Sequence, residues 1–345
     1  MRRSARCSIW AARRWRTTSL SCARGEAASS MNAALLFHRT ALASPASPAL
    51  LLGSRLVADH AGLHQRVVQT ACWLQHQGIG KGDRVALFMR NHIEYLEWLL
   101  ATLWIGAIVV PVNFKLHPRE LDYILSHSGA ALLVVCSEGA AALQDGGLTW
   151  RGRHVNTDSE PHYLDGDGDR TLEAPRVMPA DACAWLFYTS GTTGRPKGVE
   201  IVHRNILAMT LAYFASVDAI TSSDAMLYAA PMSHGAGLYA FPALMAGARH
   251  VIPESAGFHA PEILALAQSV GGICMFAAPT MVRRLVDAAQ KDPTGIDGIK
   301  TIAYGGGPMY VADIRRALDV MGGRFVQIYG QGESPMTISA LSRAE

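Results

Sequence analysis

The most informative segment of the sequence is Tyr188-Thr-Ser-Gly-Thr-Thr-Gly-Arg-Pro-Lys-Gly198. It joins two short apolar segments, residues 184–189 and 198–202, which the pattern predicts as strands. Its backbone N–H groups, its hydroxyls and the Lys197 ammonium form a flexible, donor-rich loop, which suits a polyphosphate ligand. The spacing differs from the GxxxxGK[ST] of P-loop enzymes, and a strand rather than a helix is expected after Lys197. A glycine- and threonine-rich hairpin turn is the structural alternative, but a tight turn needs no such run of donors.

Short apolar segments alternate with amphipathic ones on both sides of this loop. Strands are expected at residues 84–89, 108–112, 131–136, 184–189, 198–202, 225–230, 248–252, 272–277 and 301–304. Helices are expected at residues 63–77, 94–104, 121–126, 206–217, 261–270, 280–290 and 311–318. This alternation predicts an α/β fold with mostly parallel, buried strands under helices. We expect a first α/β subdomain at residues 31–180 and a second, which carries the motifs, at residues 181–345.

The composition indicates a folded protein with a mildly acidic body. Of the 345 residues, 50% are hydrophobic and 17% are charged, which suits a chain with a buried core. The net charge of +3 comes from residues 1–30, which hold seven arginines and one glutamate, whereas residues 31–345 hold 24 basic and 27 acidic residues. A nucleic-acid partner is therefore not expected. The longest apolar stretch, residues 98–112, is shorter than the roughly 20 residues that span a bilayer, so no transmembrane segment is expected.

The cysteines and the first 30 residues bear on the compartment. The six cysteines are scattered, without a CxxC pair or zinc-like spacing, so neither disulfides nor a metal site is expected. This cysteine usage indicates a reducing compartment. Residues 1–30 form an arm rich in arginine and serine, a composition typical of a mitochondrial transit peptide. A start codon placed too early is the favoured alternative, because Met31 opens a segment of different composition. We expect a cytoplasmic protein, or a mitochondrial one if the arm is a transit peptide.

The donor-rich loop resembles the signature of the adenylate-forming superfamily, which includes acyl-CoA synthetases, aryl-CoA ligases, luciferases and peptide-synthetase adenylation domains. Three further segments match the family in order. Pro231-Met-Ser-His-Gly-Ala-Gly237 resembles the motif that lines the acyl pocket, Tyr304-Gly-Gly-Gly-Pro-Met309 the segment that contacts adenine, and Tyr329-Gly-Gln-Gly-Glu333 the motif usually written Tyr-Gly-x-Thr-Glu. The resemblance, over residues 33–345, implies the large N-terminal domain of these enzymes, with two mostly parallel sheets layered with helices, cut before the final barrel portion and the C-terminal domain.

The resemblance implies ATP-dependent activation of a fatty or aromatic carboxylic acid to an acyl-adenylate, followed by thioesterification to coenzyme A. Such a site must neutralise a triphosphate and hold the acid in line with the α-phosphorus. The implied nucleotide-binding residues are Thr189, Ser190, Gly191, Thr192, Thr193, Gly194, Lys197, Gly305, Gly306, Gly307, Gln327, Tyr329 and Gly330. The acyl group is expected at His234, Gly235 and Tyr239. Lys197 and Glu333 are the expected catalytic residues, with Glu333 as the Mg²⁺ ligand because hard cations prefer carboxylate and phosphate oxygens.

Several residues also have plainer interpretations. Glu333 could be a charge at a helix N-terminus, the glycines at 305–307 an ordinary turn before the next helix, and His234 a packed core residue. The sequence also departs from the family at Gly332, where a threonine is usual, and it ends before the family's ribose-binding aspartate and C-terminal lysine. A non-catalytic fragment that binds a nucleotide or an acyl group is therefore the alternative function.

Overall fold

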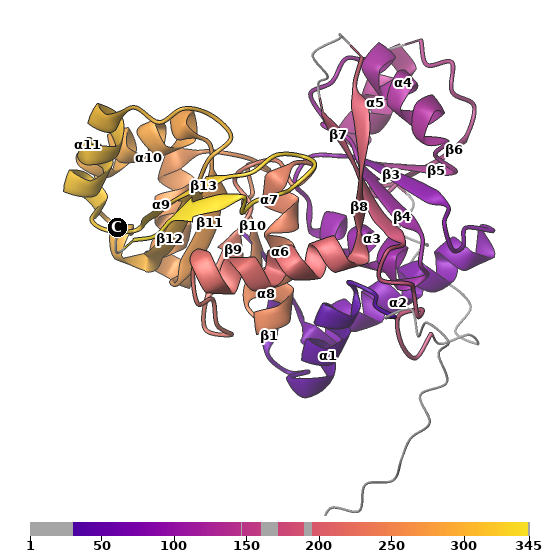
Figure 1. Cartoon of the computed structure of the whole chain (residues 1–345), viewed down its shortest axis with the longest axis horizontal. Coiled ribbons are helices and arrows are strands. Elements are labelled where there is room, and N and C mark those ends of the chain that lie inside the picture. Colours follow the sequence, from indigo (N-terminus) through magenta and orange to yellow (C-terminus); the bar gives the residue numbers. More distant parts are fainter. Residues whose placement is uncertain (1–29, 146, 160–171, 190–194, 344–345) are drawn as a thin grey trace, which may run out of the picture.

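The computed structural model describes residues 30–145, 147–159, 172–189 and 195–343 (Figure 1). Residues 1–29 of the arginine-rich arm lie outside the described residues, and so do Ser190, Gly191, Thr192, Thr193 and Gly194 of the signature loop. Among the residues in these ranges, no helix is both long and apolar enough to cross a membrane.

The first sheet has six strands in the order β6-β5-β3-β4-β7-β8. Their bounds are β3 (Arg84–Phe88), β4 (Ile108–Pro111), β5 (Leu132–Val135), β6 (Arg153–Asn156), β7 (Cys183–Thr189) and β8 (Lys197–Val202). All neighbours pair in parallel except β7 and β8, which form an antiparallel hairpin. Alternate residues of β3 enter different cores, with Val85 and Leu87 on one face and Ala86 and Phe88 on the other. The period-2 pattern thus buries both faces, as a parallel sheet requires.

Helices cover both faces of this sheet. The helices of this half are α2 (His60–His76), α3 (Ile93–Trp104), α4 (Pro118–Ser128) and α5 (Ser137–Asp145). Apolar side chains of α2 and α3 share the core of Val85, whereas those of α4 share the core of Phe88. Helix α4 begins with a capping box between His117 and Glu120.

The second sheet has eight strands in the order β14-β13-β12-β11-β9-β10-β1-β2. Their bounds are β1 (Pro48–Leu52), β2 (Arg55–Asp59), β9 (Ala225–Leu227), β10 (Arg249–Ile252), β11 (Ile273–Ala277), β12 (Ile299–Tyr304), β13 (Phe325–Tyr329) and β14 (Ser339–Leu341). The central strands are parallel, and an antiparallel strand closes each edge. The prediction of two mostly parallel sheets in an α/β fold is therefore confirmed.

The helices of this half also form two layers. They are α1 (Leu35–Ala43), α6 (His203–Ser216), α7 (Gly235–Leu238), α8 (Ala240–Ala246), α9 (Ala260–Val270), α10 (Pro279–Lys291), α11 (Val311–Met321) and the 3₁₀ turn η2 (Ile296–Gly298). Helices α9, α10 and α11 cover the outer face of the second sheet (Figure 1). Helices α1, α6 and α8 pack in the core that joins the two sheets, where Trp98, Trp104 and Trp185 are fully buried.

Strand pairing crosses the subdomain boundary that we expect between residues 180 and 181. Strands β1 and β2 come early in the chain but pair in the second sheet, whereas the β7–β8 hairpin belongs to the first.

Strand β9 ends at Leu227 rather than at residue 230, because the Asn91 amide takes the place of a neighbouring strand as the hydrogen-bond donor there. Asn91 Nδ2 donates to the carbonyls of Tyr228 (2.7 Å) and Ala230 (2.9 Å).

Candidate active site

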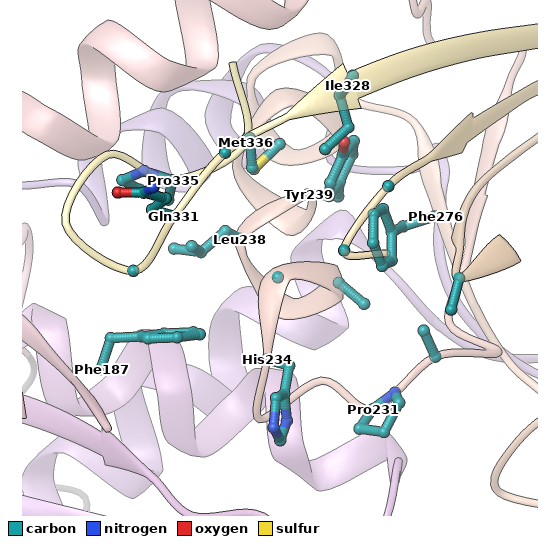
Figure 2. A pocket seen from close by; sticks show the side chains of 18 of the residues that line it. Phe187, Pro231, His234, Leu238, Tyr239, Phe276, Ile328, Gln331, Pro335 and Met336 are labelled. Atoms are coloured by element: carbon teal, nitrogen blue, oxygen red, sulfur yellow. The ribbon is translucent and has the colours of Figure 1, made fainter. Parts of the chain in front are cut away.

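A cavity of about 380 Å³ lies where chain segments from both sheets meet (Figure 2). Most of its walls follow the carboxyl ends of the parallel strands β4, β11, β12 and β13, which is where open α/β sheets bind ligands. The lining residues are Asn113, Lys115, Phe187, Ala230, Pro231, His234, Gly235, Ala236, Leu238, Tyr239, Phe276, Ala278, Gly305, Gly306, Ile328, Gly330, Gln331, Gly332, Pro335 and Met336. Three of the four sequence motifs therefore contribute directly to one cavity.

One end of the cavity is apolar and is closed by the core. Figure 2 shows Tyr239, Ile328 and Met336 at the end opposite His234. The Tyr239 ring is 1% exposed, crosses Tyr213 edge-on at 5.6 Å and lies 5.5 Å from the Phe276 ring. Burial raises the pKa of Tyr239 above its ordinary value, and its hydroxyl has no hydrogen-bond partner among the described residues. This end suits the hydrophobic part of a ligand.

His234 lies at the other end and directly precedes α7. Its Nδ1 is 3.0 Å from Ser233 Oγ, and its ring meets Phe187 edge-on at 6.3 Å. Burial lowers the pKa of His234, so the imidazole is neutral at neutral pH. A neutral imidazole can donate one hydrogen bond from its N–H group to a carboxylate while adding no charge to the cavity. Gly235 follows at the cavity wall, where an added β-carbon would meet no atom within 4 Å.

Asn91 holds the motif that carries His234. Besides its two amide donor bonds, its Oδ1 accepts from the Met232 backbone N–H at 2.8 Å, and the side chain is buried. The motif therefore has a fixed backbone although it belongs to no strand. Sequence reasoning missed Asn91, and its place three residues after the end of the buried strand β3 is the signal that could have pointed to it.

The signature hairpin lies beside the cavity. Thr189, the last residue of β7, pairs with Lys197, the first residue of β8, and the Lys197 side chain is exposed. An added β-carbon on Gly332 would lie 2.7 Å from Thr189 Cγ2 and 3.1 Å from Phe187 Cδ1. The structure thus brings the first and fourth motifs into contact. It also gives a steric reason for glycine rather than threonine at position 332.

The glycine segments after β12 and β13 have structural reasons of their own. A β-carbon on Gly305 would lie 2.5 Å from the Ile328 carbonyl oxygen, and one on Gly330 would lie 2.6 Å from the Met336 nitrogen. Gly306 has a φ of 78°, which favours glycine. Gly307 is exposed and is not part of the cavity lining. The turn interpretation is therefore supported for this segment, and close approach by a ligand stays a prediction for Gly305 and Gly306, which line the cavity.

The remaining nucleotide candidates surround the end of β13. Gln327 accepts a hydrogen bond from the Tyr304 hydroxyl at 3.2 Å. The Tyr329 ring is 52% exposed, and its hydroxyl accepts from Gln331 Nε2 at 2.7 Å, so a ring face is open to solvent. Glu333 is exposed on the next loop, between two segments of the cavity wall. It does not begin a helix, because the next element is β14, so the interpretation of Glu333 as a helix N-terminal charge is wrong.

Lys115 is a cation at the cavity that sequence reasoning did not select. It follows β4 and also lines a second cavity of about 350 Å³, which shares Asn113 and Pro231 with the first. Its side chain is exposed, and its backbone N–H donates to Asn113 Oδ1 at 3.0 Å. The signal in the sequence was the rarity of lysine, since the chain has only five.

One group of metal-ligating side chains lies away from the cavity. His92, Glu94 and Asp158 bring ligand atoms within 4.8 Å of one another. His92 and Glu94 belong to the N-terminus of α3, and Asp158 accepts from the Ser137 N–H at the start of α5 (2.7 Å). Helix capping accounts for these side chains.

Comparison with known proteins identifies the family. The model of the AMP-binding enzyme family matches residues 37–344, nearly all of the described chain. The chain belongs to the AMP-binding enzyme family. The adenylate-forming resemblance seen in the motifs is thereby confirmed.

Named relatives of this AMP-binding enzyme cover the same region. Feruloyl-CoA synthase from an Amycolatopsis species is 33% identical over 314 residues, which are 89% of this chain and 60% of the relative. A fatty acid–acyl-carrier-protein ligase of Streptomyces coeruleorubidus is 29% identical over 87% of this chain and 58% of the relative. The structure of o-succinylbenzoate CoA synthetase from Bacillus subtilis matches 91% of this chain and 61% of that chain, with a TM-score of 0.78 and 26% identity. The chain thus spans about 60% of the length of these relatives.

Proposed function

We propose that this AMP-binding enzyme activates a carboxylic acid with ATP and then transfers the acyl group to the thiol of coenzyme A. One observation carries the proposal: three sequence motifs line a single cavity, and the signature hairpin contacts that cavity through Thr189. The named relatives act on acids that are aromatic or fatty. The proposed chemistry is that of a whole enzyme, and this chain spans about 60% of the length of the named relatives.

The first step needs charge neutralisation and alignment. A carboxylate oxygen of the acid attacks the α-phosphorus of ATP, and pyrophosphate leaves with the electrons of the broken P–O bond. Lys197 and Thr189, the β7–β8 pair nearest the signature loop, would bind the phosphates that leave. His234 would orient the carboxylate through its neutral imidazole, while Phe276 and Tyr239 enclose the apolar part of the acid.

The adenine and the magnesium ion have candidate partners in the same region. The exposed Tyr329 ring offers a stacking face for the purine, and Gly305 and Gly306 allow a close approach. Glu333 is the candidate Mg²⁺ ligand, and one exposed carboxylate together with substrate phosphates fits the way this ion binds. When bound, the ion would neutralise phosphate charge. Gln327 would act on the nucleotide site indirectly, through the hydrogen bond that it accepts from the Tyr304 hydroxyl.

The second step is attack of a thiol on the acyl-adenylate, with AMP as the leaving group. Coenzyme A is the proposed thiol because the synthetases among the relatives are named for it. A carrier-protein thiol is the other candidate, because one relative is named as an acyl-carrier-protein ligase. A cytoplasmic location would supply ATP and coenzyme A to this reaction.

Acid-dependent exchange of labelled pyrophosphate into ATP tests the first step. The 345-residue chain and any longer form that the gene encodes should be tested with a panel of aromatic and fatty acids. Exchange with one class of acid and not with the other would identify the class of acid that the enzyme activates. Saturable ATP binding without exchange by the 345-residue chain would support the alternative of a nucleotide-binding fragment, and absence of exchange by a folded longer form would contradict the proposed function.

A further inference from the structure

The outer end of the β7–β8 hairpin is supported by side chains more than by the sheet. Among the described residues, β7 pairs with β4 only at Trp185 opposite Val109, and β8 is the edge strand. The hairpin continues from there through Tyr188 to Thr189, beside α4 and α5 (Figure 1). Because a two-stranded ribbon is marginally stable by itself, the position of its end depends on what packs against it.

His127 of α4 supplies that support. Its Nδ1 lies 2.8 Å from the Tyr188 hydroxyl, and the two rings meet edge-on with centroids 5.8 Å apart. On the same helix, Tyr123 lies one turn earlier and stacks on the imidazole with ring centroids 5.2 Å apart. The imidazole is therefore oriented by its own helix while it binds the hairpin.

The Tyr188 ring in turn lies against the strand that carries Lys197. Tyr188 is the cross-strand partner of Gly198, and an added β-carbon at Gly198 would lie 3.1 Å from Tyr188 Cζ. The next pair toward the loop is Thr189 with Lys197. Burial, with a smaller contribution from Tyr123, raises the pKa of Tyr188 to about 12, so its hydroxyl stays protonated and can donate to His127 Nδ1.

We propose that His127 is a positioning residue for the triphosphate of ATP, because it fixes, through Tyr188, the outer end of the β7–β8 hairpin, which carries Thr189 and Lys197. The inference rests on the proposed function and adds a residue that lies outside all four motifs. Because the Lys197 side chain is exposed, the position of its ammonium group depends on where the backbone of β8 places Lys197. AMP lacks the two outer phosphates and should not need this support.

Equilibrium binding of MgATP and of AMP to the 345-residue chain separates this role from a general effect on folding. His127→Ala should weaken MgATP binding by about three- to tenfold, the loss expected for one hydrogen bond, while AMP binding is unchanged. His127→Gln keeps a side-chain acceptor and should restore most of the affinity. Tyr188→Phe should reproduce the loss, and the double variant Tyr188→Phe with His127→Ala should be no weaker than either single variant.

Glu120→Ala is the matched control. It removes a capping bond of the same helix, the 3.1 Å contact between Glu120 Oε2 and the His117 N–H, at the end far from Tyr188. It should leave the ratio of ATP to AMP affinity unchanged. Equal losses for ATP and AMP in His127→Ala, an equal change in Glu120→Ala, or no change in His127→Ala would each overturn the proposal. If the unaltered chain does not bind MgATP, the positioning role is wrong whether or not it binds AMP, whereas the proposed function fails only if a folded longer form shows no acid-dependent exchange.

Discussion

Gly332 lies against Thr189, although 143 positions separate them in the sequence: a β-carbon on Gly332 would be 2.7 Å from Thr189 Cγ2. This contact joins the loop after β13 to the signature hairpin. Gly332→Ala should therefore lower the free energy of unfolding by about 1–3 kcal/mol, as overpacking does. Urea denaturation measures this change.

Thr189→Ser removes the methyl group that the new β-carbon would meet and keeps the hydroxyl. The double variant of Gly332→Ala with Thr189→Ser should regain part of the lost stability, although Phe187 remains close. Strictly additive effects of the two substitutions would contradict this contact.

Lys197 should be needed for chemistry and not for folding. Its side chain is exposed at the end of β8, so Lys197→Ala should leave the denaturation midpoint nearly unchanged. If its ammonium binds the leaving phosphates, acid-dependent pyrophosphate exchange should fall by about 10²-fold or more. Lys291→Ala, at the end of α10, is the control. An unchanged exchange rate in Lys197→Ala would remove this residue from the mechanism.

Gly235 should determine how large an acid fits beside His234. It lines the cavity, and neither a positive φ nor a close contact demands a glycine there. Gly235→Ala should keep or slightly raise the stability, and Gly235→Val should disfavour larger acids over smaller ones by about tenfold or more, in the ratio of kcat/KM. Equal losses for all acids would indicate a general effect on the site instead.

Buried histidines should make the fold sensitive to acid. Burial lowers the pKa of His250 to about 3, with a smaller contribution from His60, and lowers that of His203 to about 4. The unfolded chain takes up protons at these residues below a pH of about 6.5, whereas the folded chain does not. The contribution of these two histidines to stability should therefore be constant above that pH and fall below it, by about 1.4 kcal/mol per pH unit for each histidine until its folded pKa is reached.

Urea midpoints between pH 7.5 and pH 4.5 measure this slope. In the unaltered chain, the Ala33 N–H donates to His203 Nδ1 at 3.1 Å, and His203→Gln retains an acceptor for it. This variant should reduce the slope of stability against pH by about 1.4 kcal/mol per pH unit, which corresponds to one proton. The same slope in this variant as in the unaltered chain would show that His203 does not carry the effect.

Apolar periodicity predicted the elements whose apolar residues are buried against segments nearby in the sequence. Helix α2 and strand β3 agree with the expected ranges because their patterns follow from burial alone. Strands β1 and β2 were missed because β1 gains its place from β10, which lies about 200 residues later in the chain. Long-range pairing of this kind leaves no local signal.

The candidate site was predicted as far as its motifs extend. His234, Gly235 and Tyr239 were expected at the acyl group, and all three line the cavity. Asn91 could not be assigned from the sequence, because its bonds to Tyr228 and Met232 join residues far apart in the chain. Its role follows from buried backbone groups that need partners, which becomes visible only once the fold is known.

The most direct test of the proposed function is acid-dependent exchange of labelled pyrophosphate into ATP by the longest form of the protein that the gene encodes. The proposed function predicts exchange that requires both Mg²⁺ and a carboxylic acid, and that falls strongly in Lys197→Ala and in Glu333→Gln. A folded preparation that binds MgATP but exchanges no pyrophosphate with any acid in a panel of aromatic and fatty acids would contradict it.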